Sequence, residues 1–368
     1  MMETNKRTRT GPELIRATKP FAQEDRRRSW RHVASTLGLL LGLLSATCLN
    51  LPWLLRLSLS VLTGLLIVRM FVIYHDYLHG AILGRSWLAA VIFRAFGLLV
   101  LAPPSIWKQS HDHHHHHNGQ YFADSMGEVW LMTTDEYAKA SRRRRLAYAV
   151  VRHPLIILLG YFTTFLYSLC LHQLLTKPRQ HLDAAVALLI HAGLITGLAV
   201  FAPAALVFTF LVPLLLADAL GAYLFYAQHN FPGAQFRNRT DWDYATAALH
   251  SSSYLRMNPV MHWFTANIGY HHVHHMNARI PFYRLPEAMA GIEELQSPGT
   301  TSLHPCDVYR CLRLKLWDAE RNCLISFKEY RDALGCGEKI VAAARQARGF
   351  DGAPAADRSH DHRSAVSI

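Results

Sequence analysis

The segment LLRLSLSVLTGLLIVRMFVIYHDYLHG (residues 54–80) runs from a long apolar stretch directly into a pair of histidines. A helix needs about 20 apolar residues to cross a bilayer, so residues 54–74 predict a transmembrane helix. His75 and His79 follow at a helical i, i+4 spacing, which turns both imidazoles to one face. The segment therefore predicts a membrane protein with metal-ligand chemistry at the end of a span.

Apolar sequence on either side of this segment predicts further crossings. Residues 33–51 precede it, separated by the turn NLPW at residues 50–53, and residues 184–226 form a second long apolar block with Pro203 near its middle. Each block is long enough for two crossings joined by a tight turn. We therefore predict an all-α integral membrane fold with four transmembrane helices, near residues 33–51, 54–74, 184–202 and 204–226.

Two shorter apolar stretches are predicted not to cross. Residues 87–102 contain Arg94 and end before two prolines, and residues 154–175 are followed by basic residues. We expect both to be re-entrant or interfacial helices. If the histidines at residues 75–79, 111–117 and 271–275 share one metal site, an odd number of crossings between them is excluded, and with the basic N-terminus in the cytosol all three groups reach the cytosolic face, where a helical cap is expected to hold a dinuclear metal site.

The distribution of charge agrees with this topology. The chain has 368 residues, 17% of them charged, and a net charge of +12. Basic residues gather before apolar stretches, at residues 26–31 and 142–145, as the positive-inside rule and anionic lipid headgroups favour. Membrane lipids, and not nucleic acid, are therefore the expected partners. The six cysteines form no CxxC pair and indicate reduced thiols, not a disulfide framework.

Two further histidine clusters accompany the first. They read HDHHHHH (residues 111–117) and HHVHH (residues 271–275). The pattern HxxHH turns three imidazoles to one side of a helix; it fits the third cluster from His271, and the second from either His111 or His113. Imidazole suits iron, copper, nickel and zinc, and so many ligands exceed what one tetrahedral metal uses. The residues alone predict two metal ions that share a histidine cage.

The motifs around these clusters resemble those of the membrane fatty acid desaturase family, of the acyl-lipid type. HDxxH, WKxxHxxHHxxN and NxGxHxxHH, the last followed by RIP at residues 279–281, carry the resemblance. QHNF (228–231), DWDY (241–244) and SSSY (251–254) extend it. The position of WK at residues 107–108 favours His111 as the start of the second cluster, which leaves His113, His116 and His117 as extra residues that the family pattern does not require.

The resemblance also implies a ninth ligand at the cytosolic end of the last span, where this chain has His229. That histidine follows the apolar stretch 204–226 almost immediately, so its position is compatible with a ligand. The expected metal ligands are His75, His79, His111, His114, His115, His229, His271, His274 and His275.

The chemistry implied by the resemblance is O2-dependent desaturation at two iron ions. Side chains lack the oxidising power to remove hydrogen from an unactivated acyl chain, so a metal with dioxygen must provide it. An HPGG haem-attachment motif is absent, so we expect electrons from a separate protein of ferredoxin or cytochrome b5 type. The substrate is expected to be an acyl-lipid or other acyl carrier, with a Δ12 or ω-6 outcome, in the bacterial cytoplasmic membrane.

Further residues near the clusters are candidates for supporting roles. Asp76 is expected either to hold a ligand imidazole through its second nitrogen or to face water. The resemblance adds further polar residues that would support the ligands: Asn118, Gln228, Asn267, Asp241 and Asp243. Trp107, Trp263 and Tyr270 are expected to line the substrate path, with aromatic packing at the membrane interface as the alternative.

Arg69, Asp218 and His191 are ionisable residues inside the predicted spans. An intramembrane acid such as Asp218 is a functional candidate, although a buried pair with Arg69 or with another polar group is at least as good an interpretation. His191 has no visible partner in the sequence, and a hydrogen-bonded structural role is expected for it.

The resulting domain organisation has four parts. Residues 1–32 form a cytosolic basic arm, and residues 33–290 form the desaturase domain with histidine boxes at 75–79, 111–115 and 271–275. Residues 291–350 form a cytosolic C-terminal segment, and residues 351–368 are expected to be disordered.

Two rival functions remain. A hydroxylase or ketolase of the same superfamily, acting on carotenoids, alkanes or sphingolipids, shares the histidine boxes. A metal transporter with a histidine-rich loop is the non-enzyme alternative, but transporters place polar ligands inside the spans, whereas these boxes lie outside the apolar segments.

Overall fold

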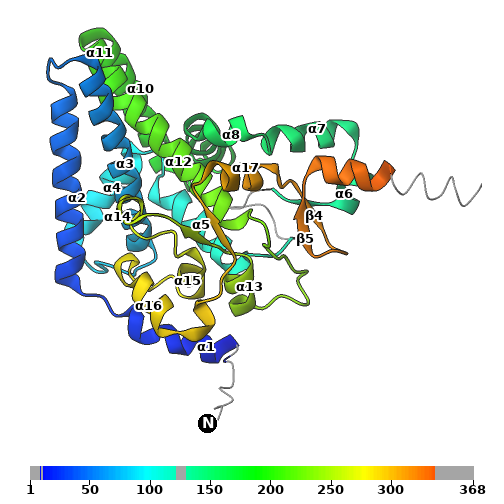
Figure 1. The fold of residues 1–368 in the computed structure, drawn as a ribbon. Coiled ribbons are helices and arrows are strands. Elements are labelled where there is room, and N and C mark those ends of the chain that lie inside the picture. Colours follow the sequence, from blue (N-terminus) through cyan, green and yellow to red (C-terminus); the bar gives the residue numbers. More distant parts are fainter. Residues whose placement is uncertain (1–8, 10, 122–129, 336–368) are drawn as a thin grey trace, which may run out of the picture. The chain divides into compact units, whose positions relative to one another are not determined.

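The computed structural model describes residue 9 and residues 11–121 and 130–335. By its internal contacts the chain divides into two units, residues 1–326 and residues 327–368. The first unit carries all the elements discussed below and is mostly helical (Figure 1). The predicted disordered tail, residues 351–368, lies outside the described residues, and the domain boundaries remain predictions.

The helices begin and end as follows. They are α1 (Gly11–Thr18), α2 (Arg26–Thr47), α3 (Trp53–Leu78), α4 (Trp87–Leu99), α5 (Pro104–His117), α6 (Thr134–Lys139), α7 (Arg142–Val151), α8 (Pro154–Leu158), α9 (His172–Thr176), α10 (Leu182–Phe201), α11 (Pro203–Ala205), α12 (Val212–His229), α13 (Tyr244–His250), α14 (Pro259–Phe264), α15 (His271–Met276), α16 (Leu285–Gly291) and α17 (Pro305–Arg313). Stretches Tyr161–Leu171 and Leu206–Leu211 are π-helical, and Lys19–Ala22, Phe282–Arg284 and Glu293–Leu295 are short 3-10 turns.

Within the described residues, five short strands form two small sheets. β1 (Met132–Thr133) pairs in parallel with β4 (Leu316–Asp318), and β4 pairs in antiparallel fashion with β5 (Cys323–Ile325). β2 (Tyr254–Arg256) pairs in parallel with β3 (Thr300–Ser302). The sheets tie the segments on either side of α17 to the segments that follow α5 and α13.

Three described helices are long and apolar enough to cross a membrane: Trp53–Leu78, Leu182–Phe201 and Pro203–His229. They coincide with three of the four predicted spans. The predicted first span, residues 33–51, falls in α2, which ends at Thr47 and does not meet the same criterion of length and composition. Its first turns contain RRRSWRH, which is too polar for the interior of a bilayer.

The stretch predicted to be re-entrant is a sharply bent helix pair. α4 and α5 meet at 89°, and together they satisfy the criterion for one broken span or a re-entrant loop. Leu101, in the turn between them, has φ +53°, and Pro103 and Pro104 follow. Proline restricts the residue before it and cannot continue the first helix, so α5 begins in a new direction.

Close packing in the apolar part depends on a glycine. α3 packs against both α2 and α12. A Cβ on Gly64 would lie 2.6 Å from Leu216 Cδ2 and 2.9 Å from Pro213 O, so only glycine permits this approach. Small residues at such contacts let helix backbones come close in a membrane. Because α3 ends at the first histidine box and α12 ends at His229, this contact sets the positions of both.

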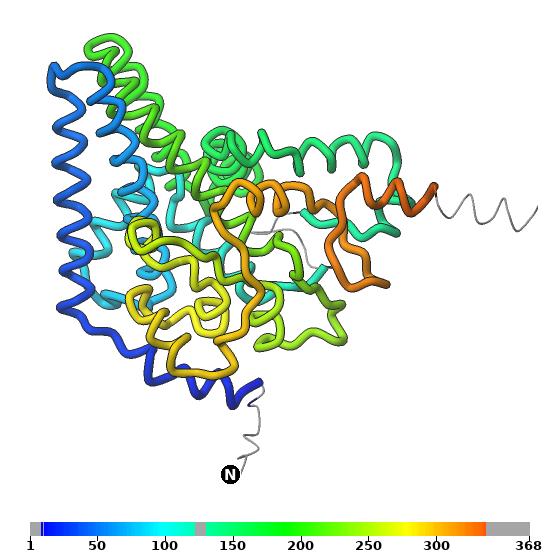
Figure 2. Tube along the Cα trace, in the orientation of Figure 1, coloured from blue at the N-terminus to red at the C-terminus, as the bar shows by residue number. Residues whose placement is uncertain are grey.

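The N-terminal arm is folded against the histidine-bearing region. Figure 2 shows the blue N-terminal segment beside the yellow segment that contains α16. Asn277 Nδ2 donates to Thr18 Oγ1 at 2.8 Å, and Arg284 Nη1 donates to Pro20 O at 3.0 Å. Leu14 is fully buried. The sequence predicts a basic arm here, but its apolar face makes α1 part of the packed unit.

Two of the three ionisable residues singled out inside the spans, His191 and Arg69, have hydrogen-bond partners, whereas Asp218 Oδ2 is buried without one in the described part of the chain. His191 Nδ1 lies 3.2 Å from Tyr161 Oη, and its Nε2 lies 2.9 Å from Leu99 O, which confirms the structural role. Arg69 contacts Thr36, His32 and the Trp263 carbonyl, so the interpretation of an Arg69–Asp218 pair is wrong.

Candidate metal centre

The candidate metal centre gathers histidines from four separate helices. α3 provides His75 and, at its end, His79; α5 provides three histidines; α12 ends at His229; α15 provides three more. All nine predicted ligands converge, in one group of five and one group of four. Within each group the candidate ligand atoms lie within 4.8 Å of one another.

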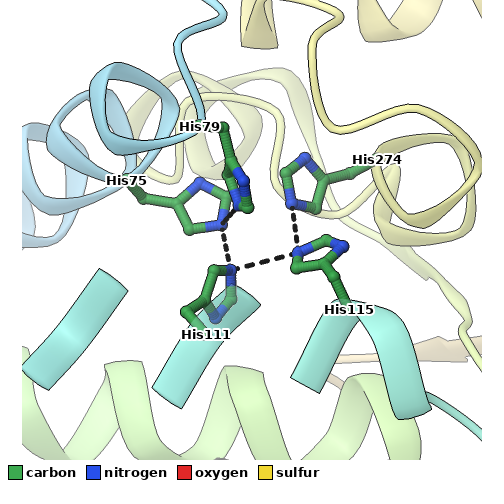
Figure 3. Close-up of side chains that lie close together, drawn as sticks. All are labelled: His75, His79, His111, His115 and His274. Atoms are coloured by element: carbon green, nitrogen blue, oxygen red, sulfur yellow. Dashed lines mark hydrogen bonds between the residues drawn. The ribbon is translucent and has the colours of Figure 1, made fainter. Parts of the chain in front are cut away.

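Group one contains His75, His79, His111, His115 and His274 (Figure 3). The Nε2 atoms of His75 and His111 are 2.7 Å apart, and those of His111 and His115 are 3.1 Å apart. His274 Nε2 lies 3.1 Å from His115 Nε2, and His79 Nε2 lies 3.3 Å from His75 Nε2. The rings of three helices thus point their outer nitrogens at one common space.

Group two contains His114, His229, His271 and His275. His271 Nε2 lies 2.8 Å from His229 Nε2, and His114 Nε2 lies 3.1 Å from His229 Nε2. His275 Nε2 lies 3.1 Å from His271 Nε2. His229 therefore contacts ligands from α5 and from α15.

The two groups are neighbours because consecutive residues on two helices enter different groups. On α5, His115 belongs to group one and His114 to group two. On α15, His274 belongs to group one and His275 to group two. The rings of His115 and His275 stack across the boundary with centroids 4.2 Å apart. The arrangement suits two cations held side by side.

The chemistry of these residues fits a pair of metal ions. A neutral imidazole offers one N–H and one lone pair, so four or five Nε2 atoms facing one space cannot all satisfy each other by hydrogen bonds. Burial lowers the pKa of His271, His274 and His275 well below the usual value, which keeps these rings neutral. Ligand histidines must be neutral, and imidazole nitrogen is a preferred donor for iron, copper, nickel and zinc.

Two of these histidines, His75 and His229, are oriented by a contact of their Nδ1 atom with an oxygen. His75 Nδ1 lies 3.2 Å from Asp76 Oδ1, while Asp76 Oδ2 accepts from the Phe282 backbone N–H at 2.6 Å. His229 Nδ1 lies 3.1 Å from the Ser251 carbonyl oxygen. Such contacts fix the tautomer and direct Nε2 toward the metal. The sequence suggests the Asp76 contact but not the Ser251 carbonyl, because a backbone contact has no signal in the sequence.

The amide candidates support the backbone and do not contact the nine histidines. Asn118 Nδ2 donates to Ser252 Oγ at 2.9 Å, and Gln228 Nε2 donates to Ile268 O at 2.9 Å. Asn267 Nδ2 donates to Phe282 O at 3.2 Å. These bonds join α5, α12 and the segment before α15 to their neighbours, and a supporting role for the three amides at the ligands remains a prediction.

The acidic candidates after α12 lie away from the histidines. Asp241 is exposed and accepts from Asn238 Nδ2 at 2.8 Å. Asp243 caps α13 by accepting from the Thr246 backbone N–H at 2.8 Å. Their hydrogen bonds stabilise a loop and the N-terminus of α13, and the supporting role expected for them at the metal site remains a prediction.

The three aromatic candidates have different surroundings. Trp107 stacks on His111 with ring centroids 5.2 Å apart and borders a large cavity. Trp263 packs under the Arg69 guanidinium, 4.2 Å from the ring centroid. Tyr270 packs against Tyr254 with centroids 4.8 Å apart. Of the three, Trp107 is the one that borders this cavity.

The surplus histidines face away from both groups. His116 is exposed and its Nδ1 contacts Asp112 O at 2.6 Å, while His117 Nδ1 contacts His113 O at 2.9 Å. His272 is buried, and its Nε2 lies 3.0 Å from the Leu295 carbonyl oxygen. The HxxHH pattern that begins at His111 is therefore the one whose imidazoles lie in the two groups.

A large cavity opens beside the histidines. It has a volume of about 710 Å³ and is bordered by His75, His111 and His271 at one end. Its other walls are mostly apolar side chains of α3, α12 and the π-helical stretch Tyr161–Leu171, and it includes Asp218. The cavity provides space for a long apolar chain next to the candidate metal centre.

Comparison with known proteins agrees with this site. Residues 51–304 match the family model described as fatty acid desaturase. A relative from Bacillus subtilis (strain 168) named "Fatty acid desaturase" is 30% identical over 86% of this chain and 90% of its own length. The "sn-1 oleoyl-lipid 12-desaturase" of Synechocystis sp. is 24% identical over 74% of this chain and 77% of its own. The "Delta(12)-fatty-acid desaturase" of Arabidopsis thaliana is 24% identical over 63% of this chain and 64% of its own.

The matched region spans all three histidine boxes, the bent pair α4–α5 and the end of α12. Its long apolar helices agree with a membrane protein, and the family match and the relatives indicate a desaturase enzyme. It belongs to the fatty acid desaturase family.

Proposed function

We propose that this chain is an acyl-lipid desaturase that uses two iron ions and dioxygen to introduce a cis double bond into a membrane-bound acyl chain. The observation that carries the proposal is the convergence of nine imidazoles at the end of an apolar cavity of about 710 Å³. Group one would hold one iron ion and group two the other. The iron ions, when bound, supply with dioxygen the oxidising power that side chains lack.

The residues of the chain perform the remaining tasks. Apolar walls around the cavity bind the acyl chain and exclude water from the reacting carbons. Trp107 stacks on His111 and borders the cavity, so its ring sets the approach of the chain to group one. Asp76 and the Ser251 carbonyl hold His75 and His229 in the tautomer that leaves Nε2 as the ligand atom.

For the topology, we propose that α2, α3, α10 and the continuous helix Pro203–His229 are the four crossings. The bent pair α4–α5 then enters and returns on one side. This arrangement is supported by the basic residues 26–31 at the start of α2, which favour a cytosolic N-terminus. The metal centre would face the cytosol, where a ferredoxin or cytochrome b5 type protein supplies electrons.

For the position of the new double bond, we propose Δ12, or ω-6. The support is that two of the relatives described above are named for desaturation at position 12. The test is expression of the chain in a host with a compatible reductase, followed by analysis of total fatty acids. New dienoic acids are expected, and the His274→Ala variant serves as the inactive control. Hydroxylated acids in place of dienes would assign the chain to a hydroxylase instead.

A further inference from the structure

A small cavity distinct from the acyl cavity lies beside group two. It has a volume of about 60 Å³. His114 and His229 border it on one side, and Arg152, Asn230 and Gln120 are among its other walls. A cavity of this size holds a few water molecules or one small ion, and it is far too small for an acyl chain or a phospholipid headgroup.

Two buried cations belong to this region. Arg152 follows α7 and is 1% exposed, and Lys315 follows α17 and is 8% exposed. Lysine and arginine are rarely so buried unless a carboxylate pairs with them. No carboxylate among the described residues forms a salt bridge with either of them.

The hydrogen bonds of these cations go to neutral groups. Arg152 Nη2 donates to Asn230 Oδ1 at 2.7 Å and to Leu314 O at 3.0 Å. Lys315 Nζ donates to the Arg152 carbonyl oxygen. The carbonyls belong to the ends of α7 and α17, where the helix dipole is negative. Arg152 Nε is buried with no hydrogen-bond partner in the described part of the chain.

The two cations also share one aromatic ring. The Arg152 guanidinium carbon lies 5.1 Å from the Tyr226 ring centroid, and Lys315 Nζ lies 6.0 Å from the same centroid. Burial, and secondarily the charge of Arg152, lowers the pKa of Lys315 to about 7. Dipoles and one ring thus offset only part of the cost of burying two like charges.

We propose that the small cavity is a binding site for a small monovalent oxyanion, of the size of formate or bicarbonate, that pairs with Arg152. A planar oxyanion has two oxygens: one can accept the Arg152 Nε–H, which has no other partner in the described part of the chain, and the other can accept from a second donor of the cavity wall, such as the Gln120 amide. Bound there, the anion neutralises the charge pair at the ends of α7 and α17. It also places negative charge next to His114 and His229, and these two histidines do not border the acyl cavity.

The test uses the full-length protein in detergent and formate as the probe. Formate at constant ionic strength is expected to raise the Tm of the wild type by a few degrees in a saturable manner, because it binds the folded state alone. Chloride at the same concentration is expected to have a smaller effect, since it has one spherical centre and not two oxygens that can accept from two separate donors. The site does not depend on the proposed reaction, so the measurement is informative even for protein without turnover.

Variants test whether the response to formate arises in this cavity. Gln120→Glu places a tethered carboxylate in the cavity, so it is expected to raise Tm without formate and to abolish the response to formate. Arg152→Gln and Lys315→Met are expected to lose the response, and Arg144→Gln, at an exposed position of α7, is expected to keep it. If Arg152→Gln does not fold, Gln120→Glu and Lys315→Met still show whether the response to formate arises in this cavity.

Two results would overturn the proposal. One is a wild-type Tm that does not change with formate. The other is a formate response that persists in Gln120→Glu and Lys315→Met but disappears when the metal is removed by a chelator, because formate would then bind the metal ions.

Discussion

At the scale of single residues, the histidines of the centre direct Nε2 toward one another, and their burial favours the neutral imidazole. The distances between neighbouring Nε2 atoms are 2.7–3.3 Å. Repulsion between lone pairs at such separations is relieved when a cation occupies the space they share. The roles of individual histidines then differ sharply between residues that are adjacent in the sequence.

His115→Ala and His274→Ala are expected to abolish turnover, since each removes a nitrogen from group one. His116→Ala is expected to keep most of the activity, because this ring is exposed and its Nδ1 contacts the carbonyl of Asp112 and no ligand histidine of the described chain by a hydrogen bond. Product yield and iron content of the purified variants provide the measurement. Equal losses for His115→Ala and His116→Ala would show that the register starting at His111 is wrong.

The Asp76 carboxylate offers a second prediction at this scale. Asp76→Asn keeps the size of the side chain but weakens its hold on His75 Nδ1 and on the Phe282 N–H. Loss of such a partner typically costs about 10–100-fold in metal affinity or activity. Iron affinity can be measured by competition with a chelator. Asp241→Asn, in the exposed loop, is the control and is expected to bind iron as the wild type does.

At the scale of helices and strands, the histidines are positioned by packing between helices that are distant in the sequence. α3 and α12 meet at Gly64, close to the middle of α3, and each carries ligands at its C-terminal end. Separation of these two helices would move His75 and His229 apart. The contact therefore links apolar packing to the geometry of both groups.

Two glycine-to-alanine changes test this link. Gly64→Ala introduces a Cβ 2.9 Å from the Pro213 carbonyl oxygen and is expected to cost about 1–3 kcal/mol of unfolding free energy. Gly42→Ala in α2 meets no atom within 4 Å and is expected to be neutral or to stabilise by up to about 1 kcal/mol. Thermal unfolding in detergent measures both. A Gly64→Ala protein as stable as Gly42→Ala would contradict the close contact.

The ends of α7 and α17 give a pH-dependent prediction. The pKa of Lys315 falls from 10.5 to about 7 on folding, so between these values the unfolded chain binds more protons than the folded chain. The stability of the folded state is therefore expected to rise as pH increases from about 7 to 10.5, and to be lost again as pH is lowered through the same window. Lys315→Met removes this contribution. The difference in Tm between variant and wild type, without added oxyanions, is expected to change across this window; a constant difference would be evidence against a buried amine.

At the scale of the whole molecule, much of the site was predictable from the sequence, and less of the fold. Helical spacing and motif resemblance identified nine histidines that the structure brings together. Apolar length identified three of the helices that can cross a membrane. The sequence does not show which neighbours a polar or aromatic side chain contacts in the folded chain, and so it did not show that Asp243 caps α13, that Trp263 packs under Arg69 or that Tyr270 packs against Tyr254.

Other features required tertiary information. The packing of α1 against α13, the carbonyl that orients His229 and the burial of Arg152 all depend on segments far apart in the chain. The apolar stretch 33–51 predicted a span, but the helix that contains it, α2, begins with polar turns and is not among the helices that meet the criterion for crossing a membrane. These contacts make the histidine-bearing segments one packed body with the apolar helices inside residues 1–326.

The proposed reaction requires that the two adjacent groups of imidazoles hold two iron ions. Iron content per chain, determined on purified protein together with Mössbauer spectra, tests this requirement without reference to turnover. We expect two iron atoms per chain in the wild type, and loss of iron when His274 of group one or His229 of group two is replaced by alanine. A fully active wild type with a single iron atom, or His274→Ala and His229→Ala proteins that keep both, would contradict it.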